Sequence, residues 1–258
     1  MKKFLVILLV SWFATNAQPL TTLPVLPLLA DSFVGFDNHG FVYYESNNTL
    51  VKSKEYNSVD YKNFGLGKIS RVDILNPLSV VVLYADFNTV VLLDNQLNET
   101  SQINFSKIKD EIIVGATGNA SRNKLWIFNE LTREIGLYDY LRKEYRVLTQ
   151  PLVGEILHYE TDFNTFSWVN DKLERFSCDI FGKITTLGLL PQFDEIRFID
   201  NSSSIIRIGT KLQYISKEGE IKSLTDLDQK TFKSFYYSPQ KLAIFTTDGI
   251  KNYKITLP

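Results

Sequence analysis

Short apolar segments alternate with short polar segments along the whole chain. The apolar runs are four to seven residues long and rich in Val, Ile, Tyr, Phe and Thr, and clusters of Asn, Asp, Gly, Pro and Ser separate them. Runs of this length and composition between turn-forming residues are typical of consecutive antiparallel β-hairpins. Because the sequence lacks long helical periodicity, the pattern predicts an all-β protein.

The pattern also repeats. The stretch ADFNTVVLLDNQLNE (85–99) returns 76 residues later as TDFNTFSWVNDKLER (161–175). Six segments share its order of polar turn, apolar run, second turn and second run. Their central runs start near Phe41, Val90, Leu125, Phe166, Ile205 and Leu242, at intervals of 49, 35, 41, 39 and 37 residues. About four strands fit each unit, and four-stranded units every 40 or so residues indicate a six-bladed β-propeller, with a strand-rich solenoid as the rival.

The two ends of the chain predict how the ring closes. The last unit, which ends LAIFTTDGIKNYKITLP, has too few residues for its outermost strand. Near the other end, residues 20–37 resemble residues 184–200, in which we expect Ile184 to Leu190 to close one blade and Glu195 to Ile199 to open the next. By analogy, Leu20 to Leu26 is a closing strand with no blade before it, so the N-terminal strand should pair with the C-terminal blade. Pro24 and Pro27 agree, because proline is tolerated on edge strands.

The first 17 residues, MKKFLVILLVSWFATNA, have the pattern of a cleaved secretory signal peptide. Their apolar run is too short to span a bilayer, which needs about 20 residues, so we expect no direct membrane insertion. Residues 18–258 are expected to form a single propeller domain. Without the two leader lysines, 26 Lys and Arg stand against 29 Asp and Glu, a formal charge of −3 that does not favour nucleic acid. Export with a lone cysteine, Cys178, indicates a bacterial periplasm.

Few residues suggest chemistry. Acids recur at the turns, at Asp37, Asp86, Asp162 and Asp200, and carboxylates on one rim could bind a hard cation. An Asp that begins a turn by accepting a backbone N–H explains the recurrence without a ligand. His39 and His158 are far apart in sequence, and we expect them on a turn and a strand, while Cys178 should be a buried small hydrophobe. No known catalytic or phosphate-binding motif is present, so we expect no enzyme and no cofactor or metal.

Aromatic residues make up 13% of the chain, and several fall at expected turns or outer strands. Aromatic and Arg side chains exposed on a rim favour protein interfaces, although packing between blades would also use them. The candidate partner-binding residues are Tyr56, Tyr61, Phe64, Tyr138, Tyr140, Arg142, Tyr236 and Tyr237. Residues 53–69 are interpreted as an insertion that widens the first interval, and residues 137–152 as a second candidate loop or the outer face of an edge strand.

The phrase NPLSVVVLYADFNTVVLLDNQLNE (76–99), together with a leader ending Asn-Ala-Gln, resembles small exported β-propeller proteins of Bacteroidota. Among these, the chain resembles the Plug components of type 9 secretion translocons. The resemblance implies a periplasmic protein at the inner face of the outer membrane, a monomer within a hetero-complex with a β-barrel protein, plugging or gating protein secretion. The alternative is a carbohydrate- or metal-dependent propeller enzyme or lectin. It predicts a deep axial pocket with several carboxylates, and a narrow apolar channel would exclude it.

Overall fold

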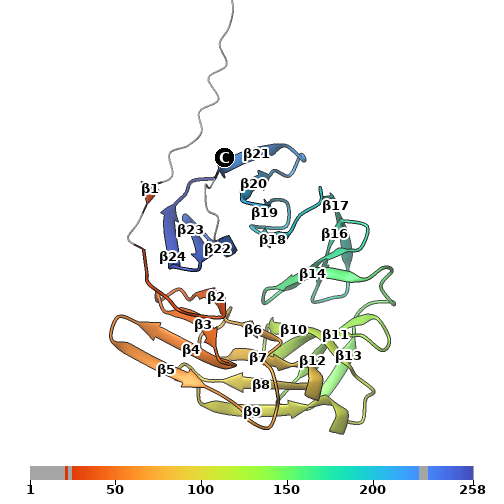
Figure 1. Cartoon of the computed structure of the whole chain (residues 1–258). Helices are drawn as coiled ribbons and strands as arrows, with labels where there is room; N and C mark the ends of the chain where they lie inside the picture. The colour runs from red at the N-terminus through yellow and green to blue at the C-terminus, as the bar shows by residue number, and fades with distance from the viewer. Residues whose placement is uncertain (1–20, 23–24, 227–231, 258) are drawn as a thin grey trace, which may run out of the picture.

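The computed structural model describes residues 21–22, 25–226 and 232–257, and they form six four-stranded antiparallel sheets. The sheets stand as blades around a common axis (Figure 1). The predicted six-bladed β-propeller is confirmed. The signal peptide expected at residues 1–17 lies outside the described residues.

In each blade the strands follow one another outward from the axis, and the bounds below are given in that order. Blade 1 contains β2 (Ser32–Phe36), β3 (Val42–Ser46), β4 (Thr49–Lys54) and β5 (Asn57–Tyr61). Blade 2 contains β6 (Arg71–Asp73), β7 (Val80–Tyr84), β8 (Thr89–Leu93) and β9 (Glu99–Asn104). Blade 3 contains β10 (Val114–Ala120), β11 (Lys124–Asn129), β12 (Glu134–Asp139) and β13 (Glu144–Val147).

Blade 4 contains β14 (Ile156–Thr161), β15 (Thr165–Asn170), β16 (Glu174–Asp179) and β17 (Ile184–Leu189). Blade 5 contains β18 (Glu195–Phe198), β19 (Ser204–Ile208), β20 (Lys211–Ile215) and β21 (Ile221–Asp226). Blade 6 contains β22 (Phe232–Ser238), β23 (Lys241–Thr246), β24 (Gly249–Lys254) and β1 (Thr21–Thr22). Two short 3₁₀ turns, η1 (Ala85–Phe87) and η2 (Phe105–Lys107), flank the outer half of blade 2. Within the described ranges, no helix is long and apolar enough to cross a membrane.

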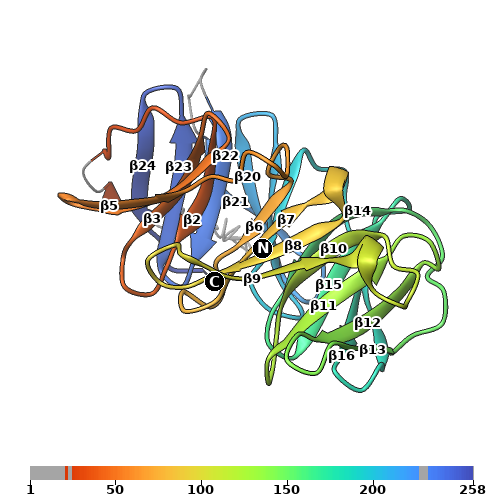
Figure 2. The same cartoon turned by 90° about the horizontal axis from the view of Figure 1, so that it is seen from below.

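Strands from both ends of the chain build blade 6, as the sequence predicts. Thr21 and Thr22 of β1 lie opposite Lys254 and Tyr253 of β24. Further along, Leu26 and Ile250 exchange two backbone hydrogen bonds of 2.9 Å. Leu20, Leu23 and Pro24 of the predicted closing strand lie outside the described residues. Figure 2, turned by 90°, shows the sheet of β22 to β24 beside that of blade 1. The pairing of β1 with β24 closes the ring between the two ends of the chain.

The repeat itself is real, but its predicted phase is wrong in one blade. The second strands of the blades begin at residues 42, 80, 124, 165, 204 and 241, which gives spacings of 38, 44, 41, 39 and 37 residues. Val90 belongs to β8, the third strand of blade 2, so its use as an equivalent of Phe166 produced the false interval of 49 residues. The widest spacing lies between blades 2 and 3, where η2 and the connection 108–113 occur.

Residues 53–69 are therefore not an insertion. They contain the end of β4, the turn 55–56, all of β5 and an ordinary connection to blade 2. Residues 137–152 contain the end of β12 and the outer strand β13, which confirms the edge-strand interpretation.

The core lies between neighbouring blades. Every residue of β7 and β8 is buried, because each middle strand is covered on both faces by the next blades. The large apolar clusters combine residues of adjacent blades: one includes Tyr43, Leu50 and Val82, and another includes Leu83, Leu125 and Tyr138. Burial of this interblade surface stabilises the ring at about 25 cal/mol per Å² of apolar area.

Candidate functional site

Six of the eight candidate partner-binding residues keep some exposure. Tyr56, Phe64 and Arg142 are exposed, whereas Tyr140, Tyr236 and Tyr237 are half-buried. Tyr61 and Tyr138 are buried, at 8% and 2% exposure, so their predicted place on an exposed rim is wrong.

The strand positions of these two tyrosines explain the correction. Tyr61 ends β5 and packs in the cluster between blades 1 and 2, where its hydroxyl donates to Glu99 Oε2 at 3.0 Å. Tyr138 lies on β12, a third strand covered on both faces, and its ring meets Phe105 edge to face at 5.0 Å between centroids. Both side chains therefore stabilise blade packing.

The strand order divides the loops between two ends of the ring. The turns from the first to the second strand and from the third to the fourth strand of each blade lie at one end, named here the turn end. The turns from the second to the third strand and the connections between blades lie at the other end, named the connection end. Tyr56, Tyr140 and Arg142 belong to the turn end, and Phe64 to the connection end. The large hydrophobic residues exposed at the turn end are Tyr56, Leu75, Leu78, Leu141, Phe163 and Phe181.

A large cavity lies at the axis. It has a volume of about 680 Å³ and follows β2 from Ser32 to Asn38, bordered by the inner strands of blades 1, 2, 4, 5 and 6. The residues Pro77, Ser238 and Pro239 border it at the turn end. A second cavity of about 450 Å³ lies between β10 and β14, and Arg71 borders both.

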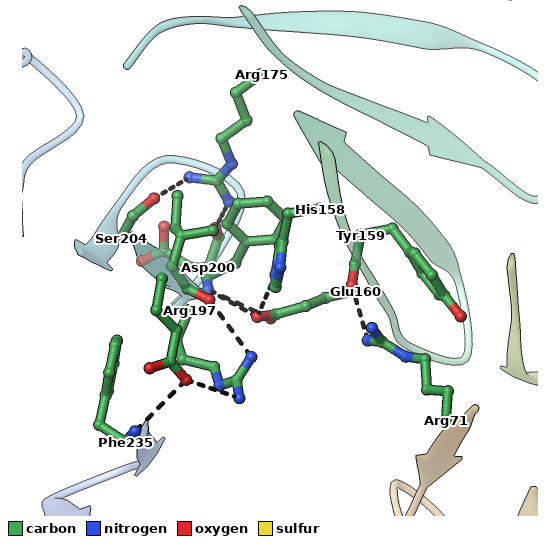
Figure 3. A network of polar contacts seen from close by, with 12 residues as sticks. Arg71, His158, Tyr159, Glu160, Arg175, Arg197, Asp200, Ser204 and Phe235 are labelled. Atoms are coloured by element: carbon green, nitrogen blue, oxygen red, sulfur yellow. Dashed lines mark hydrogen bonds and ion pairs between the residues drawn. The ribbon is translucent and has the colours of Figure 1, made fainter. Parts of the chain in front are cut away.

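A polar network lies beside the first cavity (Figure 3). Glu160 accepts the backbone N–H of Phe198 at 3.2 and 3.3 Å and contacts His158 Nε2 at 3.1 Å. Arg71 donates to the carbonyl of Tyr159 at 2.8 Å and stacks over its ring at 3.9 Å. These groups come from blades 2, 4 and 5, so only the folded ring brings them together.

Burial and charge set the protonation of this network. Burial lowers the pKa of His158; the Glu160 contact opposes that shift, and Arg197 and Arg71 add to it. Burial alone would raise the pKa of Glu160, but His158, Arg197 and Arg71 together hold it below its ordinary value. At neutral pH the pair is therefore a neutral imidazole donating to a carboxylate.

Side chains join the inner strands to one another around the axis. Asp73 of β6 accepts the N–H of Asn119 in β10 at 2.7 Å, and the Tyr159 hydroxyl of β14 contacts the N–H of Thr117 in β10 at 3.2 Å. Glu160 joins β14 to β18. Glu195 of β18 accepts the N–H of Phe235 in β22 at 3.4 Å, and Tyr236 of β22 donates to the carbonyl of Phe36 in β2 at 3.0 Å. Sequence reasoning missed this arrangement.

The turn acids act as structural groups. Asp37, Asp162 and Asp200 each accept backbone N–H groups two to four residues ahead. They lie in first-to-second strand turns, whereas Asp86 lies in η1, a second-to-third turn at the other end of the ring. The four acids thus do not converge. Within the described ranges, no group of three His, Cys, Asp or Glu side chains could hold a metal ion.

His39 lies on a turn and His158 on β14, as predicted. Cys178 is fully buried, and burial raises the pKa of its thiol to about 12. The prediction of a buried small hydrophobe is confirmed.

Four carboxylates border the axial cavity, at Asp37, Glu45, Asp73 and Glu160. The cavity is therefore not the narrow apolar channel that would exclude the sugar-binding alternative. However, Asp37, Asp73 and Glu160 already accept hydrogen bonds from protein donors. Their acceptor capacity is largely used in holding the fold.

No protein-family model and no curated protein matches the chain. Among solved structures, it is similar to the β-propeller domain of Swd1 from Myceliophteria thermophila, with a TM-score of 0.61 and 9% identity over 92% of this chain and 100% of that one. It is also similar to a DUF4221 family protein from Bacteroides vulgatus, with a TM-score of 0.59 and 9% identity over 92% of this chain and 97% of that one. A third similar structure is virginiamycin B lyase from Staphylococcus aureus, with a TM-score of 0.54 and 10% identity over 86% of this chain and 79% of that one.

These identities are low, so the likeness establishes the propeller fold and nothing finer. The similar structures include a lyase and a protein of a family described only by number. The chain is a six-bladed β-propeller related in shape to propellers of different roles.

Proposed function

We propose that this protein is a non-catalytic periplasmic β-propeller that binds an outer-membrane β-barrel protein or its complex and plugs or gates a protein-secretion translocon. The signal-peptide pattern and the resemblance to Plug components support the location and the partner class. The propeller fold supports a binding role, because its loops present a broad, rigid docking surface.

One observation carries the proposal: the turn end combines the axial cavity with exposed apolar side chains. Leu75 lies at the cavity and is partly exposed; Leu78, on the same turn, is 72% exposed. Tyr56, Leu141 and Phe181 extend this apolar character to the outer turns of blades 1, 3 and 4. Aromatic and aliphatic groups around a concave centre are typical of the buried part of a protein interface. We therefore assign docking to the turn end.

Affinity purification from the native outer membrane tests the proposal. The variant Tyr56→Ser/Leu78→Ser/Phe181→Ser removes three of the most exposed apolar side chains of the turn end. Leu29→Ser/Phe64→Ser/Val153→Ser removes three of similar exposure from the connection end and is the matched control. We expect wild type and control to recover a β-barrel protein and the turn-end variant to lose it. Recovery of no barrel by the wild type, or loss only in the control, would refute the proposal.

The sugar-binding alternative receives less support. Three of the four carboxylates at the cavity are bonded to protein donors, which leaves fewer carboxylate oxygens to bind a saccharide or a metal ion.

A further inference from the structure

The ring of inner strands is joined at five of its six boundaries. Side-chain hydrogen bonds link β6 to β10, β10 to β14, β14 to β18, β18 to β22 and β22 to β2. Among the described residues, no hydrogen bond joins β2 to β6. Blades 1 and 2 are joined instead farther out, where Asn48 bonds the connection 62–70 and Lys52 donates to the carbonyl of Asn95.

The axial cavity borders this unjoined boundary. Consecutive residues of both strands line it, Ser32 to Val34 in β2 and Arg71 to Asp73 in β6. Side chains of consecutive residues in a strand point to opposite faces. Since both faces contribute, the backbone edges of the two strands border the cavity. An uncovered strand edge presents N–H and C=O groups that accept a further chain.

Two arginines of the wall have unused donors, beside acceptor oxygens such as those of Ser32, Asn38 and Glu45. Arg71 uses one guanidinium nitrogen on the Tyr159 carbonyl, and its other nitrogens have no acceptor among the described residues. Arg197 makes only long contacts, 3.4 Å to the Ile196 carbonyl and 3.3 Å to Glu195. A ligand rich in carbonyl oxygens would satisfy these donors.

The charges around the cavity are nearly balanced. Arg71 and Arg197 stand against Asp73 and Glu160, and Lys52 lies 3.9 Å from Asp37, which leaves Glu45 as one excess carboxylate. Such a wall has no strong preference for an anion or a cation. Apolar groups line the cavity as well, among them Phe33, Val72, Leu75, Pro77 and Phe198. The wall fits a neutral ligand that alternates donors, acceptors and apolar groups along its length.

We propose that the axial cavity binds a short extended polypeptide segment of the partner, laid along the free edges of β2 and β6. These strands are five and three residues long, so the bound segment spans three to five residues. Main-chain hydrogen bonds supply the affinity, as in strand addition to a sheet edge. The inference rests on the proposed docking function and names the element of the partner that the cavity receives.

Site-specific photo-crosslinking tests it. The full-length protein carries p-benzoylphenylalanine at Ser238, beside the cavity, or at Ser223, an exposed position on β21. After irradiation in the native cells, mass spectrometry maps the adducts. We expect the Ser238 probe to mark one contiguous segment of a partner protein and the Ser223 probe not to mark it. A saccharide or small-molecule adduct at Ser238, or the same adducts at both positions, would overturn the proposal.

Binding to the purified partner supplies a second readout. Ser32→Trp fills the cavity from β2, and Arg71→Gln removes a donor from β6. We expect each to raise the dissociation constant by about tenfold or more. Ser223→Trp and Lys109→Gln, which removes an exposed charge from the connection end, should leave it unchanged. Melting curves of all four variants identify any that fail to fold. If the partner is recovered and both cavity variants bind it normally, the cavity inference fails and the docking proposal stands. If no partner is recovered from the membrane, the docking proposal itself fails.

Discussion

Arg175 shows how single buried side chains hold adjacent blades together. It extends from β16 and is 3% exposed; it donates to the carbonyls of Ser203 and Asp200 and to Ser204 Oγ, and stacks over Phe198 at 4.1 Å. Burial lowers its pKa to about 10, so it stays charged at neutral pH. A charge in this position joins blade 4 to blade 5.

We predict that Arg175→Met destabilises the protein by about 3 kcal/mol, because three acceptors lose a charged donor in a buried site. Urea unfolding followed by intrinsic fluorescence measures the loss. Arg142→Met removes an exposed arginine and should stay within about 0.5 kcal/mol of wild type. Equal effects of the two substitutions would show that the buried contacts contribute nothing.

His158 makes the stability of the ring depend on pH. Its folded pKa is lowered by burial and by Arg197 and Arg71, against the opposing effect of Glu160, and the ordinary value is 6.5. Below that value the unfolded chain binds a proton that the folded chain resists, so the free energy of unfolding falls as the pH falls.

We predict that His158→Gln flattens this dependence. Unfolding free energies at pH of about 7.5 and about 5.5 should differ less in the variant than in the wild type. His39→Gln, on an exposed turn, is the control and should behave as the wild type does. A His158→Gln variant with the full wild-type loss at low pH would contradict the account.

At the scale of elements, ring closure depends on close backbone contact. Gly249 begins β24 with a φ of +133°, and a Cβ there would overlap the carbonyl oxygen of Leu26 and lie 3.0 Å from the backbone of Pro27 and Leu28. Only glycine leaves room for the N-terminal segment to pair with β24.

Gly249→Ala should therefore destabilise the protein by about 2 kcal/mol more than Gly219→Ala does. Gly219 also has a positive φ, +81°, but no atom lies within 4 Å of the position that a Cβ would take there, so the control isolates the clash from the backbone strain. Hydrogen exchange at the amides of Leu26 and Ile250 should rise only in Gly249→Ala. Similar losses in both variants would argue against close packing of the closing strand.

The sequence predicted where strands occur better than it predicted which strands occupy the same position in different blades. The likeness between residues 20–37 and 184–200 located the closing strand, because each segment runs from the outer strand of one blade into the inner strand of the next. The repeat of Asp-Phe-Asn-Thr misled, because Asp begins a turn equally well at either end of a blade. Tyr138 was misplaced for a related reason: strands buried on both faces lose the alternation that marks exposed positions.

At the scale of the whole molecule, the axial network could not be read from the chain. His158 and Glu160 stand two residues apart, but Arg71 and Phe198 approach them only because blades 2, 4 and 5 meet at the axis. The unjoined boundary between β2 and β6 is likewise a property of the closed ring, because among the described residues it lacks the side-chain hydrogen bond found at each of the other five.

Docking at the turn end is the central claim, and hydrogen–deuterium exchange of the protein alone and in its native complex tests it most directly. The account predicts slower exchange in the complex at the turns 37–41, 74–79 and 239–240 and along β2 and β6. Slower exchange confined to the blade connections 62–70, 105–113 and 148–155 would contradict it.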